Sequence, residues 1–227
     1  MSRVLVLAGG SPHAHDFDAL GPALVEVAED AGHDVALTGH PDEAAKQLRG
    51  GAFDVLLMHG LWWRMLDPAY DAWRDDHAYE TPATTRQALA DFVASGGGLV
   101  ALHTAPVCFD DWDGWGDVLG ASWSWGVSGH PPYGPVEAQV IADHPVVASI
   151  GPTIALDDEI YGGMDMRQVE VLATARRTPD DEDQPVIWTH RYGDGRVVFD
   201  GFGHNAESIV HSSNARVIRQ AIEWVAP

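Results

Sequence analysis

Short apolar runs alternate with amphipathic helical segments through the first half of the chain, and this alternation constrains the fold most strongly. Residues 4–8, 34–38, 53–58 and 99–103 each resemble a buried strand. Between the first two runs, apolar residues recur at helical spacing until Gly32. The resulting βαβα order predicts a doubly wound, mostly parallel sheet in three layers, which is a flavodoxin-like α/β fold.

The second half of the chain is less regular. Residues 121–135 are rich in Gly, Trp, Ser and Pro, and we expect a long ordered loop there. Further strands are predicted over 136–141, 169–174, 185–189 and 196–199. Tyr192 to Gly195 carries a hairpin signal between the last two strands. Because we find no repeat or linker, we expect residues 1–227 to form a single domain.

The charge of the chain excludes several classes of function. Its formal net charge of −21 argues against binding to nucleic acid and to anionic membrane surfaces, since both need clustered Lys and Arg. No apolar run approaches the roughly 20 residues that span a bilayer, so a cytoplasmic location is the default expectation. Cys108 is the single cysteine, and its apolar neighbours favour a buried thiol over a nucleophile.

Histidines follow the predicted strands repeatedly. His15 comes after the first strand, His59 and His103 end the third and fourth, and His204 follows the last. Ligands of open α/β sheets bind beyond the carboxyl ends of the strands. We therefore expect these imidazoles to line an active or binding site.

The segment from Gly96 to Ala105 resembles a nucleophile elbow, in which the turn after a central strand directs one side chain into the cleft. In glutamine amidotransferases of this architecture that side chain is a cysteine, but here it is His103, which suits acid–base chemistry or metal binding. His204 lies where such folds keep their triad histidine. The alternative for each imidazole is a structural role, in which it hydrogen-bonds only to a backbone carbonyl at the end of a strand.

Other candidates for the site lie in three segments. Glu159 follows an apolar strand and suits a general acid or base, with Tyr161 as a hydrogen-bond donor. Asp16 is either a substrate ligand or the N-cap of the next helix. Loop tryptophans can hold sugar rings, although core packing explains any one of them equally well. The candidates are Trp62, Trp63 and Trp125.

The sequence requires no cofactor, although imidazoles suit Zn²⁺ or Mn²⁺. His59, His103 and His204 are the candidate ligands. No compact metal-binding motif links them in the sequence. The two alternatives are therefore a site without a cofactor and a site that binds a divalent metal.

Five motifs in order resemble the trehalose-utilisation, or ThuA-like, family from end to end. They are Gly96–His103, Asp143–Val146, Asp158–Tyr161, Pro185–Trp188 and Gly203–His204. The resemblance implies a class I glutamine amidotransferase-like fold without the catalytic cysteine, and a role in bacterial carbohydrate metabolism.

Carried over by position, His103, Glu159, Tyr161 and His204 match residues of the family's motifs, and His130 lies where the family usually has a histidine. The resemblance implies a small sugar as partner: trehalose, a related glycoside or a keto derivative. A homodimer is compatible with the architecture, although no residue pattern demonstrates it.

We expect an enzyme that isomerises or eliminates a keto-glycoside by acid–base chemistry. His103, Glu159 and His204 are the expected catalytic residues. His15, Asp16, His59, Trp62, Trp63, Trp125, His130 and Tyr161 are expected to bind the substrate. One rival is a non-catalytic carbohydrate-binding or regulatory domain. A hydrolase with Cys108 as nucleophile is disfavoured, since Cys108 lies five residues beyond the elbow.

Overall fold

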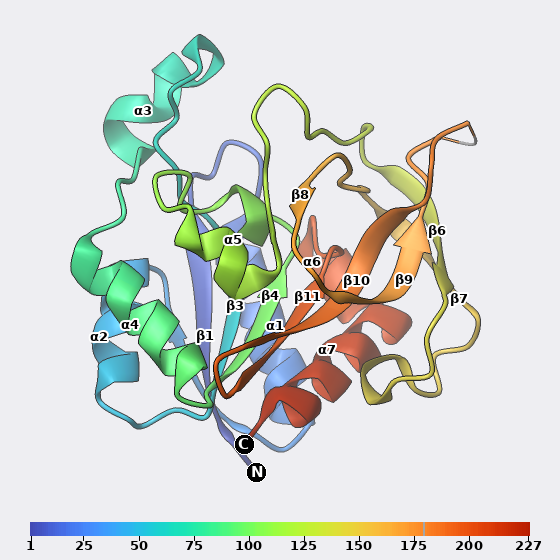
Figure 1. Cartoon of the computed structure of the whole chain (residues 1–227), viewed down its shortest axis with the longest axis horizontal. Coiled ribbons are helices and arrows are strands. Elements are labelled where there is room, and N and C mark those ends of the chain that lie inside the picture. Colours follow the sequence, from blue (N-terminus) through green and yellow to red (C-terminus); the bar gives the residue numbers. More distant parts are fainter. Residues whose placement is uncertain (179) are drawn as a thin grey trace.

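The computed structural model describes residues 1–178 and 180–227, and it is built around one nine-stranded sheet (Figure 1). The strands follow the order β2-β1-β3-β4-β11-β10-β9-β6-β7. In that order their bounds are Asp34–Thr38, Arg3–Gly10, Val55–Leu61, Gly98–Leu102, Gly195–Asp200, Gln184–Tyr192, Glu170–Ala175, Gly134–Val140 and Thr153–Asp158.

The sheet has a parallel half and an antiparallel half. β2, β1, β3, β4 and β11 pair in parallel, as the βαβα rhythm predicts. From β11 onwards every pairing among the sheet's described strands is antiparallel, beginning with the expected hairpin, in which Tyr192 pairs with Gly195. The parallel core is therefore confirmed, and an antiparallel extension that the sequence did not specify continues it.

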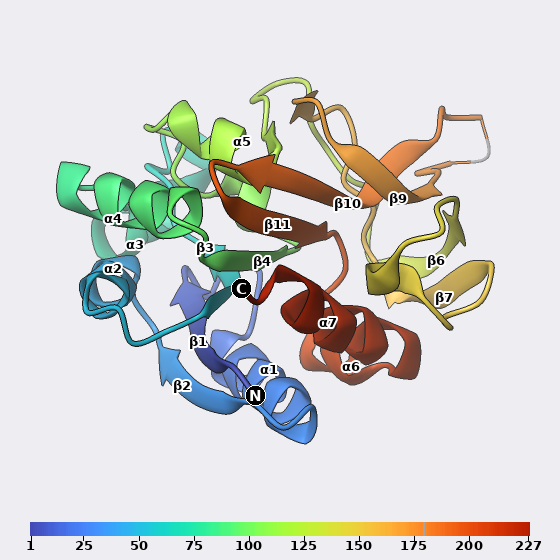
Figure 2. The ribbon, with the colours of Figure 1, turned by 60° about the horizontal axis from the view of Figure 1, so that its bottom comes forward.

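Helices cover both faces of the sheet (Figure 2). One layer contains α1 (Phe17–Asp30), α6 (Ala206–Val210) and α7 (Ser212–Val225), whose apolar residues pack with Val4 and Val6 of β1. The other contains α2 (Pro41–Arg49), α4 (Ala83–Ala94) and α5 (Gly114–Leu119), which pack with Leu5 and Leu7. Because successive side chains of β1 enter opposite layers, the strand is apolar throughout.

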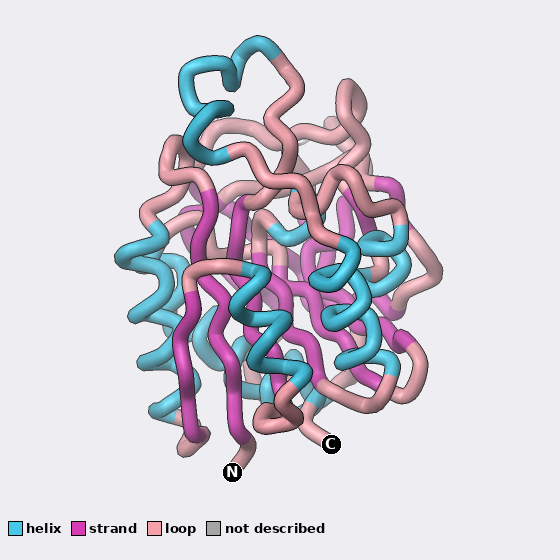
Figure 3. Tube along the Cα trace, turned by 90° about the vertical axis from the view of Figure 1, so that its left-hand side faces the viewer, coloured by secondary structure: helices cyan, strands magenta, loops and turns pink. Residues whose placement is uncertain are grey.

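A projecting segment follows β3 and rises beyond the carboxyl ends of the parallel strands (Figure 3). It contains the 3-10 turn Pro68–Tyr70 and the short helix α3 (Asp71–His77), neither of which the sequence predicted. The expected loop over 121–135 lies at the same end, between the short strand β5 (Ala121–Ser122), which pairs with β8 (Asp165–Met166), and β6. Among the described residues, no helix has the length and apolar character to cross a membrane.

Candidate active site

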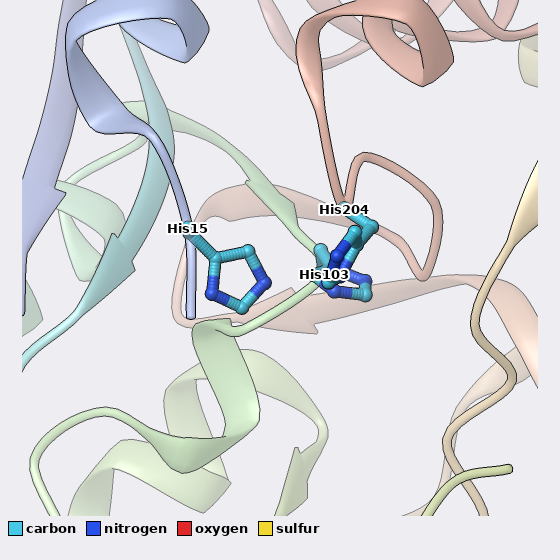
Figure 4. A group of neighbouring side chains, drawn as sticks. All are labelled: His15, His103 and His204. Carbon is cyan, nitrogen blue, oxygen red and sulfur yellow. The ribbon is translucent and has the colours of Figure 1, made fainter. Parts of the chain in front are cut away.

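Four imidazoles meet at the carboxyl end of the parallel strands. The ring centroid of His15 lies 4.8 Å from that of His204 and 5.2 Å from that of His103, and the rings of His59 and His103 are 5.9 Å apart. Figure 4 shows His15, His103 and His204 arriving from three separate segments of the chain. β3 runs on to Leu61, so His59 lies within the strand rather than after it.

His103 occupies a sharp turn immediately after β4. Its φ of +44° is a left-handed conformation that is uncommon for a residue with a Cβ, as at a nucleophile elbow. Its Nδ1–H donates to the carbonyl of Gly201 at 2.9 Å, which fixes the tautomer. Nε2 therefore carries the lone pair and accepts from the Tyr161 hydroxyl at 3.2 Å.

Glu159 is a buried carboxylate that three imidazoles surround. Its oxygens lie 3.5 Å from His103 Nε2, 3.3 Å from His130 Nδ1 and 3.3 Å from His204 Nδ1. Burial alone would raise the pKa of Glu159, but the three imidazoles around the carboxylate hold that pKa well below its usual range. The carboxylate in turn raises the pKa values of His130 and His204.

Two buried carboxyl groups end strands beside these imidazoles. Asp158, the last residue of β7, accepts the backbone N–H of Glu159 and that of Gly203, both at 2.8 Å. Asp200 ends β11, and complete burial raises its pKa well above the usual value, which favours the protonated form. Sequence analysis gave neither residue a role, although a carboxyl group that ends an apolar strand is the signal that identifies both.

His15 and His59 differ in their hydrogen bonding. His59 Nε2–H donates to the carbonyl of Gly203 at 2.7 Å, and burial lowers the pKa of His59 to about 3. Both nitrogens of His15 are buried without any partner, and burial lowers its pKa far below the usual range. Both imidazoles are therefore neutral at physiological pH.

Three of the imidazoles could hold a metal ion. His15, His103 and His204 each offer one ligand nitrogen, and these atoms lie within 4.8 Å of one another. The donor set fits such an ion, since the two orphaned nitrogens of His15 lack any other way of offsetting their burial. The Gly201 carbonyl and the Glu159 carboxylate contact the remaining nitrogens of His103 and His204, an arrangement typical of metal-bound histidines. His59, which the sequence proposed as a ligand, lies beside this group but is not part of it.

The predicted sugar-binding residues fall into two groups. Trp63, Trp125, His130 and Tyr161 line one cavity of about 110 Å³ together with His15, and we call it the inner cavity. Trp62 instead packs into the core between the sheet and the α2 and α4 layer. Asp16 caps α1 by accepting the N–H of Ala19, and it lines a neighbouring groove with His15. A groove of about 850 Å³ lies between α2 and α4, away from the imidazoles.

This architecture is a class I glutamine amidotransferase-like fold, and it carries a histidine on a left-handed turn after β4. The model of the trehalose utilisation (ThuA) family matches residues 3–225, so the chain belongs to that family. No curated protein matches the sequence.

Solved structures share the fold at low sequence identity. A ThuA-like protein from Parabacteroides merdae is 16% identical with a TM-score of 0.79, over 99% of this chain and 89% of its own. A cytoplasmic protein from Salmonella typhimurium is 15% identical with a TM-score of 0.67, over 99% and 100%. A GMP synthase component from Thermoplasma acidophilum is 13% identical with a TM-score of 0.59, over 98% and 93%. At these identities the similarity concerns the fold alone.

Proposed function

We propose that the protein is an enzyme that abstracts a proton next to the carbonyl of a keto-sugar, derived from trehalose or a related glycoside, and so isomerises it or eliminates a substituent. The observation that carries the proposal is the ionised carboxylate of Glu159, buried against the imidazoles of His103, His130 and His204. Family membership supports the sugar class, since trehalose utilisation is the family's description.

Proton transfer is assigned to His130 acting with Glu159. The strongly lowered pKa of Glu159 makes the carboxylate a weak base by itself. The same carboxylate raises the pKa of His130, and imidazoles are the side chains that most often accept and return protons near neutral pH. His130 also lines the inner cavity, and it therefore faces a bound ring.

We assign stabilisation of the developing enolate to the groups beside His103 and His204. His103 Nε2 accepts from the Tyr161 hydroxyl, and His204 Nδ1 lies 3.3 Å from the carboxylate of Glu159. We assign His15, His103 and His204 as ligands of Zn²⁺ or Mn²⁺. When bound, such an ion supplies Lewis-acid stabilisation of the enolate oxygen.

The charge of the chain supports a neutral small-molecule partner. A net charge of −21 disfavours nucleic acid, anionic membranes and phosphorylated sugars alike. We place the protein in the cytoplasm, in keeping with the description of the Salmonella structure. A homodimer stays a prediction.

The proposal is tested by proton NMR of the enzyme with 3-keto-trehalose in D₂O. Exchange or loss of the signal next to the carbonyl is expected with the native protein, and His130→Gln and Glu159→Gln should slow it by at least about 100-fold, the size of a general-base contribution. His77→Gln, in the projecting segment, is the matched control. Exchange that persists in both site variants would overturn these roles, and binding without any exchange would favour the non-catalytic carbohydrate-binding domain.

The metal assignment has its own test. The purified protein is stripped with a chelator and titrated with Zn²⁺ by calorimetry, alongside His15→Ala and His33→Ala. We expect binding to weaken by at least about 10-fold in His15→Ala only, as on loss of one ligand. Equal binding by the two variants would exclude His15 as a ligand.

A further inference from the structure

A second cavity adjoins the inner one. It has a volume of about 380 Å³ and lies between α5, the segment that follows it and β8, and we call it the outer cavity. Trp123 and Trp125 line both cavities, so the two lie on either side of these indoles. The indole of Trp125 is 47% exposed, although it is large and apolar.

The inner cavity is too small for a disaccharide. Its volume of about 110 Å³ is smaller than the roughly 150 Å³ of a cavity that encloses one benzene molecule. A disaccharide is several times larger than benzene. The inner cavity therefore accommodates one ring at most, and a second ring of the same molecule must lie outside it.

The outer cavity has the chemistry of a site for a neutral, hydroxyl-rich ring. Trp112, Trp123 and Trp125 supply flat apolar faces, and Asp113 supplies a carboxylate. Asp113 is exposed at the start of α5, where its side chain makes no cap hydrogen bond. Sugar hydroxyls donate well to carboxylates, and such hydrogen bonds are stronger than neutral ones.

The same cavity disfavours an anionic ligand. Its one arginine, Arg167, is already paired with Asp165 at 2.6 Å and Asp117 at 2.8 Å. Its guanidinium N–H groups thus already bond two carboxylates, and they do not offer a bidentate site to a phosphate. A sugar phosphate would meet uncompensated negative charge, whereas an uncharged sugar would not.

We propose that the outer cavity is a second sugar subsite, so that the substrate is a neutral glycoside of two rings, with the keto ring in the inner cavity and the other ring against Trp125 in the outer one. This inference rests on the proposed function for the identity of the inner ring. The position of the second ring rests on the two cavities and the indoles between them.

The test compares a two-ring and a one-ring substrate. We would measure kcat/KM for 3-keto-trehalose and for methyl 3-keto-α-glucoside, and take their ratio for each variant. The ratio should fall about 10-fold in Trp125→Ala, the effect of losing an aromatic anchor, and at least about 3-fold in Asp113→Asn, through loss of a charged hydrogen bond. Trp73→Ala and Asp75→Asn, at exposed positions of α3 that line neither cavity, should leave the ratio unchanged.

Each outcome decides the inference. An unchanged ratio in Trp125→Ala and Asp113→Asn would overturn the subsite even if both substrates turn over. If neither substrate turns over, the proposed function fails, and saturation-transfer NMR with 3-keto-trehalose then tests the subsite separately. Saturation of the second ring that disappears in Trp125→Ala would support it, and saturation that is absent or unchanged would overturn it.

Discussion

Acidification should destabilise the protein through His59, by an amount that follows from its burial. His59 has no exposed surface, and burial lowers its pKa to about 3 from a value of about 6.5 in an unfolded chain. Between these values the unfolded state binds more protons, so the free energy of unfolding falls as the pH is lowered. At about 1.4 kcal/mol for each pKa unit, His59 destabilises the fold by about 2 kcal/mol at pH 5 and about 5 kcal/mol below pH 3.

The measurement is urea unfolding of metal-stripped protein at pH 7, 6 and 5. His59→Gln has no titrating group there and retains an N–H donor for Gly203, so it should lose about 2 kcal/mol less than the native protein between pH 7 and 5. His15, whose pKa burial also lowers, remains in both proteins. Parallel curves for His59→Gln and the native protein would refute the reasoning.

Three further predictions concern Cys108, Asp200 and Gly203. Burial raises the pKa of Cys108 to about 12, so about one thiol in ten thousand is ionised at pH 8, and iodoacetamide should label folded protein at least about 100-fold more slowly than unfolded protein. Comparable rates would show an accessible thiolate. Burial raises the pKa of Asp200, so it keeps a proton that the unfolded chain loses above about pH 4, and stability should decline as the pH rises. The free energy of unfolding, measured from pH 5 to 9, should decline less in Asp200→Asn than in the native protein. An equal decline in the two proteins would contradict this. Gly203 has a φ of +125°, and a Cβ at this position would lie only 2.9 Å from Ile209. Gly203→Ala should therefore lower stability by about 1–3 kcal/mol and reduce turnover. Gly32→Ala, with φ +83° and no nearby atom, should lower stability without affecting turnover, and loss of turnover there would argue against a local effect.

The parallel half of the sheet was predictable because its strands are apolar on both faces and alternate with helical periodicity. The same reasoning placed the histidines at one edge. The antiparallel half was not predictable, since the pairing of β6, β7, β9 and β10 depends on contacts distant in sequence. Helix α3 was missed because none of its residues is buried, so it has no apolar stripe to reveal it.

The contrasting positions of Trp62 and Trp63 follow from the alternation of β3. Leu56, Met58 and Trp62 all enter the layer of α2 and α4, and the ring of Trp62 lies over Gly60, where a Cβ would collide with it. Trp63, of opposite parity, turns toward the inner cavity. Period-2 counting beyond the strand end would have distinguished the two from sequence alone.

The choice between His15 and His59 as metal ligand could not be made from the sequence. Both follow or end strands at the same edge of the sheet. What separates them is position: a nitrogen of His15 lies within 4.8 Å of nitrogens of His103 and His204, whereas His59 is not part of that group. Only the tertiary fold determines which nitrogens converge.

The position of β11 has a consequence for how the protein is made. This strand lies between β4 and β10 in the middle of the sheet, and the turn after it supplies the carbonyls that orient His59 and His103. While the ribosome is still synthesising the second half of the chain, the hydrogen-bonding edge of β4 therefore has no neighbour. Insertion of so late a strand closes very long loops, which slows folding. Until then the nascent chain exposes an apolar strand edge, the kind of surface that chaperones shield.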